Sequence, residues 1–355
     1  PIRSYPNRNL ASHVLGYMGP IATDYEISKY IKDKGYLNDE IIGKTGIEES
    51  YQDNLRGTNG KSIVTVDSSG NRVKTLSRSP SQPGDDIYLS LDAGLQETAE
   101  KALKGVIESV SKGKTYDSEY GDVNPFRRAP YANSGAVVVS DVKTGEVLAM
   151  ASYPNYDPNL FATGISSSDW ESLQVPDDSG PLVARPMLNI ASQMAVMPGS
   201  SFKLVSSLAA LEKGLDPQKL NTDYGFIEVG NRRFNNLLWT EEGKTWGQET
   251  LYDAIKNSCN YYFYTLALGE NPRDGTSLGV KLELNDIRAA AKQLGLDQKT
   301  GIEINIPNES SGNIPSVDKK LEIIKVMMKK YLDEKLKLFI KEGTTKSKSQ
   351  LEEDT

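Results

Sequence analysis

The sequence has very little of two residue types on which much enzyme chemistry depends, with one cysteine and one histidine among 355 residues. A single cysteine, Cys259, can form neither an internal disulfide bond nor a cysteine-rich zinc site. A single histidine, His13, excludes a multi-histidine metal site. Any Ser-His-Asp triad would have to use this residue, which lies near the N-terminus. If the protein is an enzyme, we therefore expect lysine, tyrosine or a carboxylic acid to move its protons.

The sequence also lacks long apolar runs and any excess of basic residues. No run approaches the 18 or so apolar residues that a membrane-spanning helix needs, and no signal-peptide pattern is present. The net charge of −7, with no basic stripe, argues against a nucleic-acid partner. Because the chain opens at Pro1, in sequence that is already patterned, we expect further residues upstream.

The length allows two domains, and the pattern predicts an α+β fold. Alternating residues around a Gly/Asn turn predict a hairpin over 63–76, and the Pro- and Gly-containing stretch 77–86 reads as a boundary. Residues 87–91 read as a strand, and Asp92 can cap a helix that runs to about residue 110.

A second hairpin is predicted over 135–150, with strands apolar enough to be buried on both faces. Helical patterns follow near 201–213 and 248–267. The charged residues 318–355 carry apolar positions at helical spacing, which favours an amphipathic helix with solvated charges.

The candidate nucleophile is Ser200, which follows the Pro198-Gly199 turn and precedes an apolar helical series. Lys203 lies one helical turn further on, so the two side chains share a face. A lysine in a desolvated pocket can act as a neutral base toward a serine hydroxyl, and unpaired N–H groups at a helix start favour developing negative charge. This chemistry needs no histidine.

By itself, the Ser-x-x-Lys pattern has little specificity, since a capping serine and a solvated lysine produce it often. It starts here at Ser109, Ser111, Ser140, Ser200 and Ser316. Of these, Ser200 combines a preceding Pro-Gly turn with a following apolar helix.

The second candidate pair is Ser258 and Asn260, within a helical apolar pattern. One interpretation is a helix end or interruption with local side-chain hydrogen bonds. The functional interpretation is a hydroxyl that relays a proton and an amide that holds a substrate carbonyl.

A third element of the form Lys-[Ser/Thr]-Gly occurs at residues 44–46, 143–145 and 299–301. We interpret all three as coincidental. The first lies in the N-terminal region, the second is a hairpin turn, and the third follows Asn260 too closely.

Taken together, the ordered motifs resemble the penicillin-interacting serine enzymes, which include class A β-lactamases and penicillin-binding proteins. Further segments resemble class B penicillin-binding proteins, most of all the PBP2-like type of Gram-positive bacteria. These segments are 3–6, 13–17, 46–48, 148–152, 156–159 and 300–304. The resemblance covers about residues 1–317.

The resemblance implies a β-rich N-terminal pedestal, or dimerisation domain, followed by a transpeptidase domain with an antiparallel sheet and helices. Residues 1–84 would be part of the pedestal, 85–317 the N-terminal part of the transpeptidase domain, and 318–355 a truncated, charged helical insertion. An anchor helix would precede Pro1 and place the protein at the extracytoplasmic face of the cell membrane. The strand that carries the family's third motif is expected to lie beyond this chain.

The resemblance further implies a peptidoglycan D,D-transpeptidase. Ser200 would be acylated by D-Ala-D-Ala stem peptides or by β-lactams, with Lys203 as its base and Ser258 and Asn260 as proton relay and substrate holder. A membrane glycan-polymerising protein of the SEDS type would be a partner.

Some members of the group carry a metal near the second motif. Here Trp246 stands where a histidine would be expected, and Cys259 has no histidine partner in the region, so we predict no metal and no cofactor. Two other functions stay open, a β-lactamase-like hydrolase and a non-catalytic β-lactam-binding module. The N-terminal region argues against the hydrolase, because β-lactamases are single domains.

Overall fold

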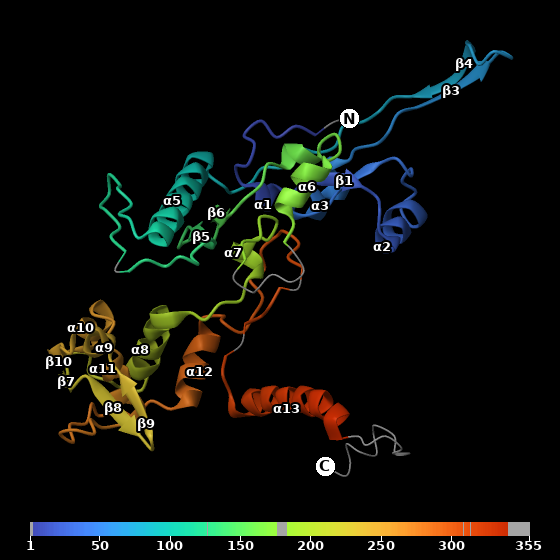
Figure 1. Cartoon of the computed structure of the whole chain (residues 1–355). Helices are drawn as coiled ribbons and strands as arrows, with labels where there is room; N and C mark the ends of the chain where they lie inside the picture. Colours follow the sequence, from blue (N-terminus) through green and yellow to red (C-terminus); the bar gives the residue numbers. More distant parts are fainter. Residues whose placement is uncertain (1–2, 126, 176–182, 308, 313, 340–355) are drawn as a thin grey trace. The chain divides into compact units, whose positions relative to one another are not determined.

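The computed structural model describes residues 3–125, 127–175, 183–307, 309–312 and 314–339, and the chain divides into two compact units (Figure 1). Unit 1 comprises Pro1–Ala195 and Thr300–Glu309, and unit 2 comprises Val196–Lys299 and Ser310–Thr355. Within the described residues, strands pair as antiparallel two-stranded ladders between helices, which confirms the predicted α+β class.

Unit 1 begins with short elements. They are α1 (Ser12–Leu15), β1 (Met18–Pro20), α2 (Asp24–Glu26), the π-helix η1 (Ile27–Lys32), β2 (Ile41–Gly43), α3 (Gly46–Ser50), α4 (Gln52–Leu55), β3 (Lys61–Val66) and β4 (Arg72–Ser79). The elements that follow are α5 (Ala93–Lys112), β5 (Gly135–Ser140), β6 (Val147–Tyr153), the 3-10 helix η2 (Pro158–Phe161), α6 (Ser167–Leu173) and α7 (Ile190–Gln193).

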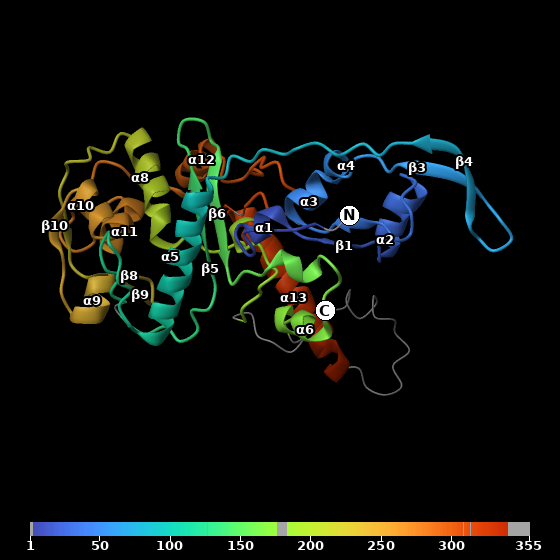
Figure 2. The same cartoon turned by 90° about the horizontal axis from the view of Figure 1, so that it is seen from above.

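The predicted hairpin over 63–76 is confirmed by the pairing of β3 with β4, and it projects from the rest of unit 1 (Figure 2). Its side chains are mostly exposed on both faces. At its turn, Asp67 accepts hydrogen bonds from the backbone N–H groups of Ser69 and Asn71. The Gly/Asn turn therefore closes in the way the sequence pattern predicted.

Helix α5 also follows the prediction, because Asp92 caps it by accepting a hydrogen bond from Leu95 N at 2.8 Å. The helix packs against β6 through Ala99, which meets the buried Ala149 and Ala151. A helix on one face of a β-hairpin thus forms this part of the core.

Two expectations for this region are wrong. Residues 87–91 form no strand; their hydrogen bond to β6 is made by a side chain, since Ser90 Oγ donates to the Val147 carbonyl at 2.7 Å. Strand β5 is not buried on both faces, since its residues alternate between half-buried and exposed, whereas β6 is buried at Ala149–Ser152. The apolar composition of β5 reflects its pairing with β6 and contact with α5 on one face only.

Unit 2 carries the remaining elements. They are the 3-10 helix η3 (Gly199–Phe202), α8 (Lys203–Glu212), β7 (Asn221–Asp223), β8 (Phe226–Val229), β9 (Arg232–Asn235), α9 (Leu237–Glu242), β10 (Gly247–Glu249), α10 (Leu251–Lys256), α11 (Asn260–Leu268), α12 (Leu284–Gln293) and α13 (Val317–Phe339).

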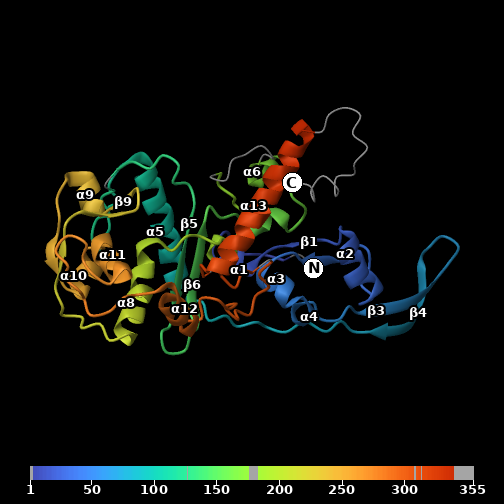
Figure 3. The same ribbon diagram turned by 90° about the horizontal axis from the view of Figure 1, so that it is seen from below.

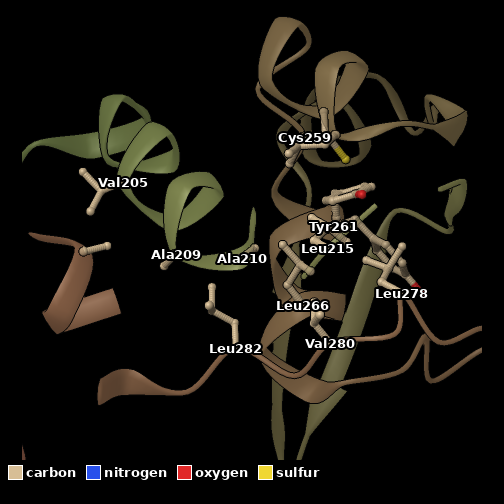
Figure 4. Close-up of a cluster of buried hydrophobic side chains, with 14 of the residues drawn as sticks. Val205, Ala209, Ala210, Leu215, Cys259, Tyr261, Leu266, Leu278, Val280 and Leu282 are labelled. Carbon is tan, nitrogen blue, oxygen red and sulfur yellow. The ribbon is translucent and has the colours of Figure 1, made fainter. Parts of the chain in front are cut away.

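The core of unit 2 gathers around α11, whose Tyr261 and Leu266 are fully buried (Figure 4). Ala209 and Ala210 of α8 face the same cluster, and α8 and α12 lie side by side (Figure 3). Small residues on α8 allow this close approach, so the helix that begins at Lys203 is held firmly in the unit.

The predicted helix over 248–267 is interrupted. It consists of α10 and α11, separated by residues 257–259, and Ser258 has a left-handed backbone with φ 53°. Of the two interpretations offered for this segment, the helix interruption is therefore present, and it carries the second candidate pair.

The predicted helix after residue 318 forms as α13, with exposed apolar side chains such as Ile324 and Met328. Residues 340–355 of the predicted insertion lie outside the described residues. Among the described helices, none combines the length and hydropathy needed to cross a bilayer.

Candidate active site

Ser200 lies in η3, the short 3-10 turn that leads into α8, and it is exposed. Gly199 adopts φ 59°, a left-handed conformation that glycine accepts without strain, which accounts for glycine after Pro198. The neighbouring Ser201 turns away, since its hydroxyl donates to the Pro198 carbonyl at 2.5 Å. Ser200 is thus exposed, whereas the hydroxyl of Ser201 is hydrogen-bonded to the backbone.

Lys203 is the first residue of α8, and its amine lies close to the other three predicted site residues. Its Nζ lies 3.3 Å from Ser200 Oγ, 3.0 Å from Ser258 Oγ and 2.7 Å from Asn260 Oδ1. The Ser258 carbonyl oxygen is a fourth neighbour, at 2.6 Å. All four predicted residues therefore meet in unit 2.

The oxygens around Lys203 differ in what they can do. The Ser258 carbonyl and Asn260 Oδ1 are acceptors only, whereas the hydroxyls of Ser200 and Ser258 can also donate. A neutral amine has two hydrogens, which the two carbonyl-type oxygens can accept, and one lone pair. That lone pair is then free for a hydroxyl proton from one of the serines.

The surroundings of Lys203 favour this neutral form. Burial lowers the pKa of the amine below its ordinary value, opposed by weaker charge effects from Cys259 and Glu249. The Phe263 ring, with its centroid 5.8 Å from Nζ, adds apolar surface at the site. Desolvation therefore increases the fraction of Lys203 that can act as a base.

The turn that carries Ser258 is held by buried polar groups. Asn257 Nδ2 donates to Glu249 Oε1 at 2.8 Å, and Cys259 N donates to the Ala254 carbonyl at 2.9 Å. Burial raises the pKa of the Glu249 carboxyl and that of the Cys259 thiol. These contacts fix the break between α10 and α11.

One residue at the site was not singled out from the sequence. Asn236 Oδ1 accepts a hydrogen bond from Asn260 N at 2.9 Å, and Asn236 Nδ2 donates to Asp223 Oδ2 at 2.8 Å. The one signal available was asparagine at the start of a helical pattern, where it caps α9. Nothing in the local sequence indicates its contacts with Asn260 and Asp223.

The three Lys-Thr-Gly triplets have local contacts. Lys44 pairs with Glu26 at 2.6 Å, and Asp141 accepts from the N–H groups of Lys143 and Thr144 in the β5–β6 turn. Thr300 N donates to Glu309 Oε1 at 2.8 Å. That the triplets are coincidental matches stays a prediction.

Among the described residues, His, Cys, Asp and Glu side chains form no group of three that could hold a metal ion. Trp246 contributes a backbone N–H to Asp223 Oδ2 at 3.1 Å. His13 is buried in unit 1, where one ring nitrogen lies 2.7 Å from the Pro186 carbonyl. That the reaction needs no metal or cofactor stays a prediction.

Comparison with known families gives two matches. Residues 135–328 match the penicillin binding protein transpeptidase domain, and residues 1–89 match the penicillin-binding protein dimerisation domain. The first match includes Lys203 and the three residues around its amine.

Among curated proteins, the peptidoglycan D,D-transpeptidase MrdA of Acinetobacter baumannii is 33% identical over 320 residues, which cover 90% of this chain and 40% of that protein. Among solved structures, PBP2 of Helicobacter pylori in its complex with MreC has a TM-score of 0.66 at 29% identity, over 91% of this chain and 50% of that chain. A peptidoglycan synthase complex that coordinates polymerization and crosslinking gives a TM-score of 0.69 at 30% identity, over 91% and 49%. The chain thus spans half or less of the length of these proteins. That the PBP2-like proteins of Gram-positive bacteria are the most similar to this chain stays a prediction.

Proposed function

The chain belongs to the penicillin-binding protein transpeptidase family, and from this premise we propose that it forms the acyl-enzyme site of a peptidoglycan D,D-transpeptidase. Ser200 is the nucleophile, Lys203 its base, and Ser258 and Asn260 the proton relay and substrate holder. The observation that carries the proposal is the Lys203 amine, which lies 3.3 Å from the Ser200 hydroxyl and is partly buried among the three other oxygens.

In the proposed reaction, Lys203 Nζ accepts the hydroxyl proton of Ser200 as Oγ bonds to the carbonyl carbon of the penultimate D-alanine of a stem peptide. The peptide bond to the terminal D-alanine breaks, and its nitrogen takes a proton that the Ser258 hydroxyl can relay from Lys203. An amine of a neighbouring peptide then attacks the acyl-serine and releases Ser200 with its proton restored. A β-lactam acylates the same oxygen by opening its ring.

The division into a pedestal part (1–84), a transpeptidase part (85–317) and a charged helical insertion (318–355) is also part of the proposal. It is supported by the two family matches, at 1–89 and 135–328. Because similar proteins occur in complexes with MreC and within a peptidoglycan synthase complex, we include a glycan-polymerising membrane partner of the SEDS type. The corresponding location is the extracytoplasmic face of the cell membrane.

The proposal is tested by incubation with a fluorescent penicillin, followed by the mass of the intact chain. The 355-residue chain and the complete product of its gene are both measured, beside Ser200→Ala and the matched control Ser201→Ala. We expect a stable adduct that Ser200→Ala abolishes and Ser201→Ala retains.

The other functions predict different outcomes. Rapid penicillin turnover without a lasting adduct would indicate a β-lactamase-like hydrolase. Adduct formation without release of D-alanine from a stem pentapeptide by the complete gene product would indicate a non-catalytic binding module. If neither protein is labelled, the acyl-serine mechanism is wrong.

A further inference from the structure

The buried amide of Asn236 connects two parts of unit 2 that are distant in sequence. Its side chain is 1% exposed and makes four hydrogen bonds. Oδ1 accepts from Asn260 N at 2.9 Å and from Leu237 N at 3.0 Å. Nδ2 donates to Asp223 Oδ2 at 2.8 Å and to Cys259 Sγ at 3.4 Å.

These partners leave one orientation for the amide. Two backbone N–H donors require an oxygen on one side, and the Asp223 carboxylate requires an N–H on the other. Asp223 is itself buried and accepts from Gly225 N at 2.8 Å and from Trp246 N at 3.1 Å. A buried carboxylate with three N–H donors is well compensated, so it can hold the amide in place.

Asn236 holds the start of α11, and the geometry of the site depends on the position of this segment. Asn260 is the first residue of α11, so its N–H has no partner within the helix. The two residues before it, Ser258 and Cys259, belong to the break, and Ser258 is in the left-handed region. Two of the oxygens around Lys203 belong to Ser258 and one to Asn260, so the position of this turn sets all three.

We infer that Asn236 is a positioning residue for acylation, which holds the turn bearing Ser258 and Asn260 against Lys203 while Asp223 fixes the orientation of its amide. The expected effect on acylation rests on the proposed function. Asn236 does not touch the reacting atoms and acts through Asn260 and Cys259.

The test compares Asn236→Ala with Asn221→Ala in the full chain. Asn221 is a matched control because it is also a buried amide of unit 2, bonded to Thr265 and Asn271 and not to the 257–260 turn. Two readouts are taken beside thermal unfolding: the rate of acylation by a fluorescent penicillin, and the pH midpoint for modification of Lys203 by acetic anhydride, mapped by mass spectrometry.

We expect both variants to unfold at lower temperature, and only Asn236→Ala to slow acylation, by about 10²-fold as for a misplaced catalytic group. We also expect only Asn236→Ala to raise the Lys203 midpoint toward the ordinary lysine value, because water enters the loosened turn. Equal acylation rates and equal midpoints in the two variants would overturn the inference.

A polarity exchange gives a second test that does not rely on truncation. Asn236→Asp places two carboxylates in contact, so we expect slower acylation. The double variant Asp223→Asn/Asn236→Asp restores a donor and an acceptor between the two positions and should recover part of the rate. Failure of the double variant to exceed Asn236→Asp would contradict the assigned orientation. If neither the unaltered chain nor the complete gene product forms an adduct, the proposed function fails, whereas the Lys203 midpoint still tests the positioning role.

Discussion

The Nζ atom of Lys203 lies 2.7 Å from Oδ1 of Asn260, and 57 residues separate them in the sequence. Lys203 begins α8 and Asn260 begins α11, so the starts of two helices meet at one amine. This contact joins the two sequence motifs into one site, and it gives the amine a fixed acceptor that leaves its lone pair for a hydroxyl proton.

The first prediction concerns Lys203 as the proposed base. Lys203→Met removes the amine while retaining an unbranched apolar side chain, and we expect Ser200 acylation by a penicillin to fall about 10²- to 10⁴-fold, the usual contribution of a general base. The rate is measured by stopped-flow or gel fluorescence. Lys213→Met, at the other end of the same helix, is the control and should retain the rate; equal losses in both would exclude a specific role for Lys203.

The second prediction is the pH dependence of acylation. If Lys203 is the base, as proposed, it must be neutral, and burial lowers its pKa below the ordinary 10.5. The rate should therefore rise with pH, because fewer amines carry a proton, and should reach half of its maximum below pH 10.5. A half-maximum at or above that pH would show that the amine is not desolvated.

The third prediction separates the hydroxyl of Ser258 from its backbone. Because Ser258 has φ 53°, Ser258→Gly relieves strain of about 1–2 kcal/mol, offset by about 0.4–1 kcal/mol from the freer unfolded chain. We expect the free energy of unfolding in urea to be retained or to increase, while acylation slows because the hydroxyl is lost.

Ser258→Val is the matched variant. A β-branched residue is strongly disfavoured at positive φ, so it should lose more than about 1 kcal/mol of stability as well as activity. Equal stability of the glycine and valine variants would contradict the strained conformation of this turn.

The fourth prediction concerns Gln96, a buried residue of α5 in unit 1. Its side chain donates to the Met150 carbonyl at 2.9 Å and accepts from Met150 N at 2.7 Å, as a neighbouring strand would. Gln96→Leu leaves both groups of β6 unpaired, at about 1–3 kcal/mol each. Thermal unfolding should occur earlier and the Met150 amide should exchange faster, whereas the exposed control Lys104→Leu should change neither.

Some of this could be predicted from the sequence because the signals are local. The Gly/Asn turn after Asp67 and the cap at Asp92 involve residues within four positions of each other, so their hairpin and helix follow from the pattern. The pairing of Ser200 with Lys203 is of the same kind, since one helical turn separates them. Resemblance to a family then related this pair to Ser258 and Asn260.

Other features depend on tertiary contacts that no local pattern records. Residues 87–91 look like a strand, yet no neighbouring strand pairs with them in the described residues. The break at Ser258 is imposed by partners such as Glu249 and Asn236, which hold the turn from other elements. Asn236 was missed for this reason, because its bond to Asn260 spans 24 residues and is evident only in the folded chain.

The most direct test of the account is tandem mass spectrometry of the peptide that ends at Lys203, after reaction of the complete gene product with penicillin. This peptide contains Ser200 and Ser201 side by side, so fragmentation distinguishes the two hydroxyls. We predict that the penicilloyl group is on Ser200. A group on Ser201, or on any residue outside this peptide, would contradict the assignment of Ser200 as the nucleophile.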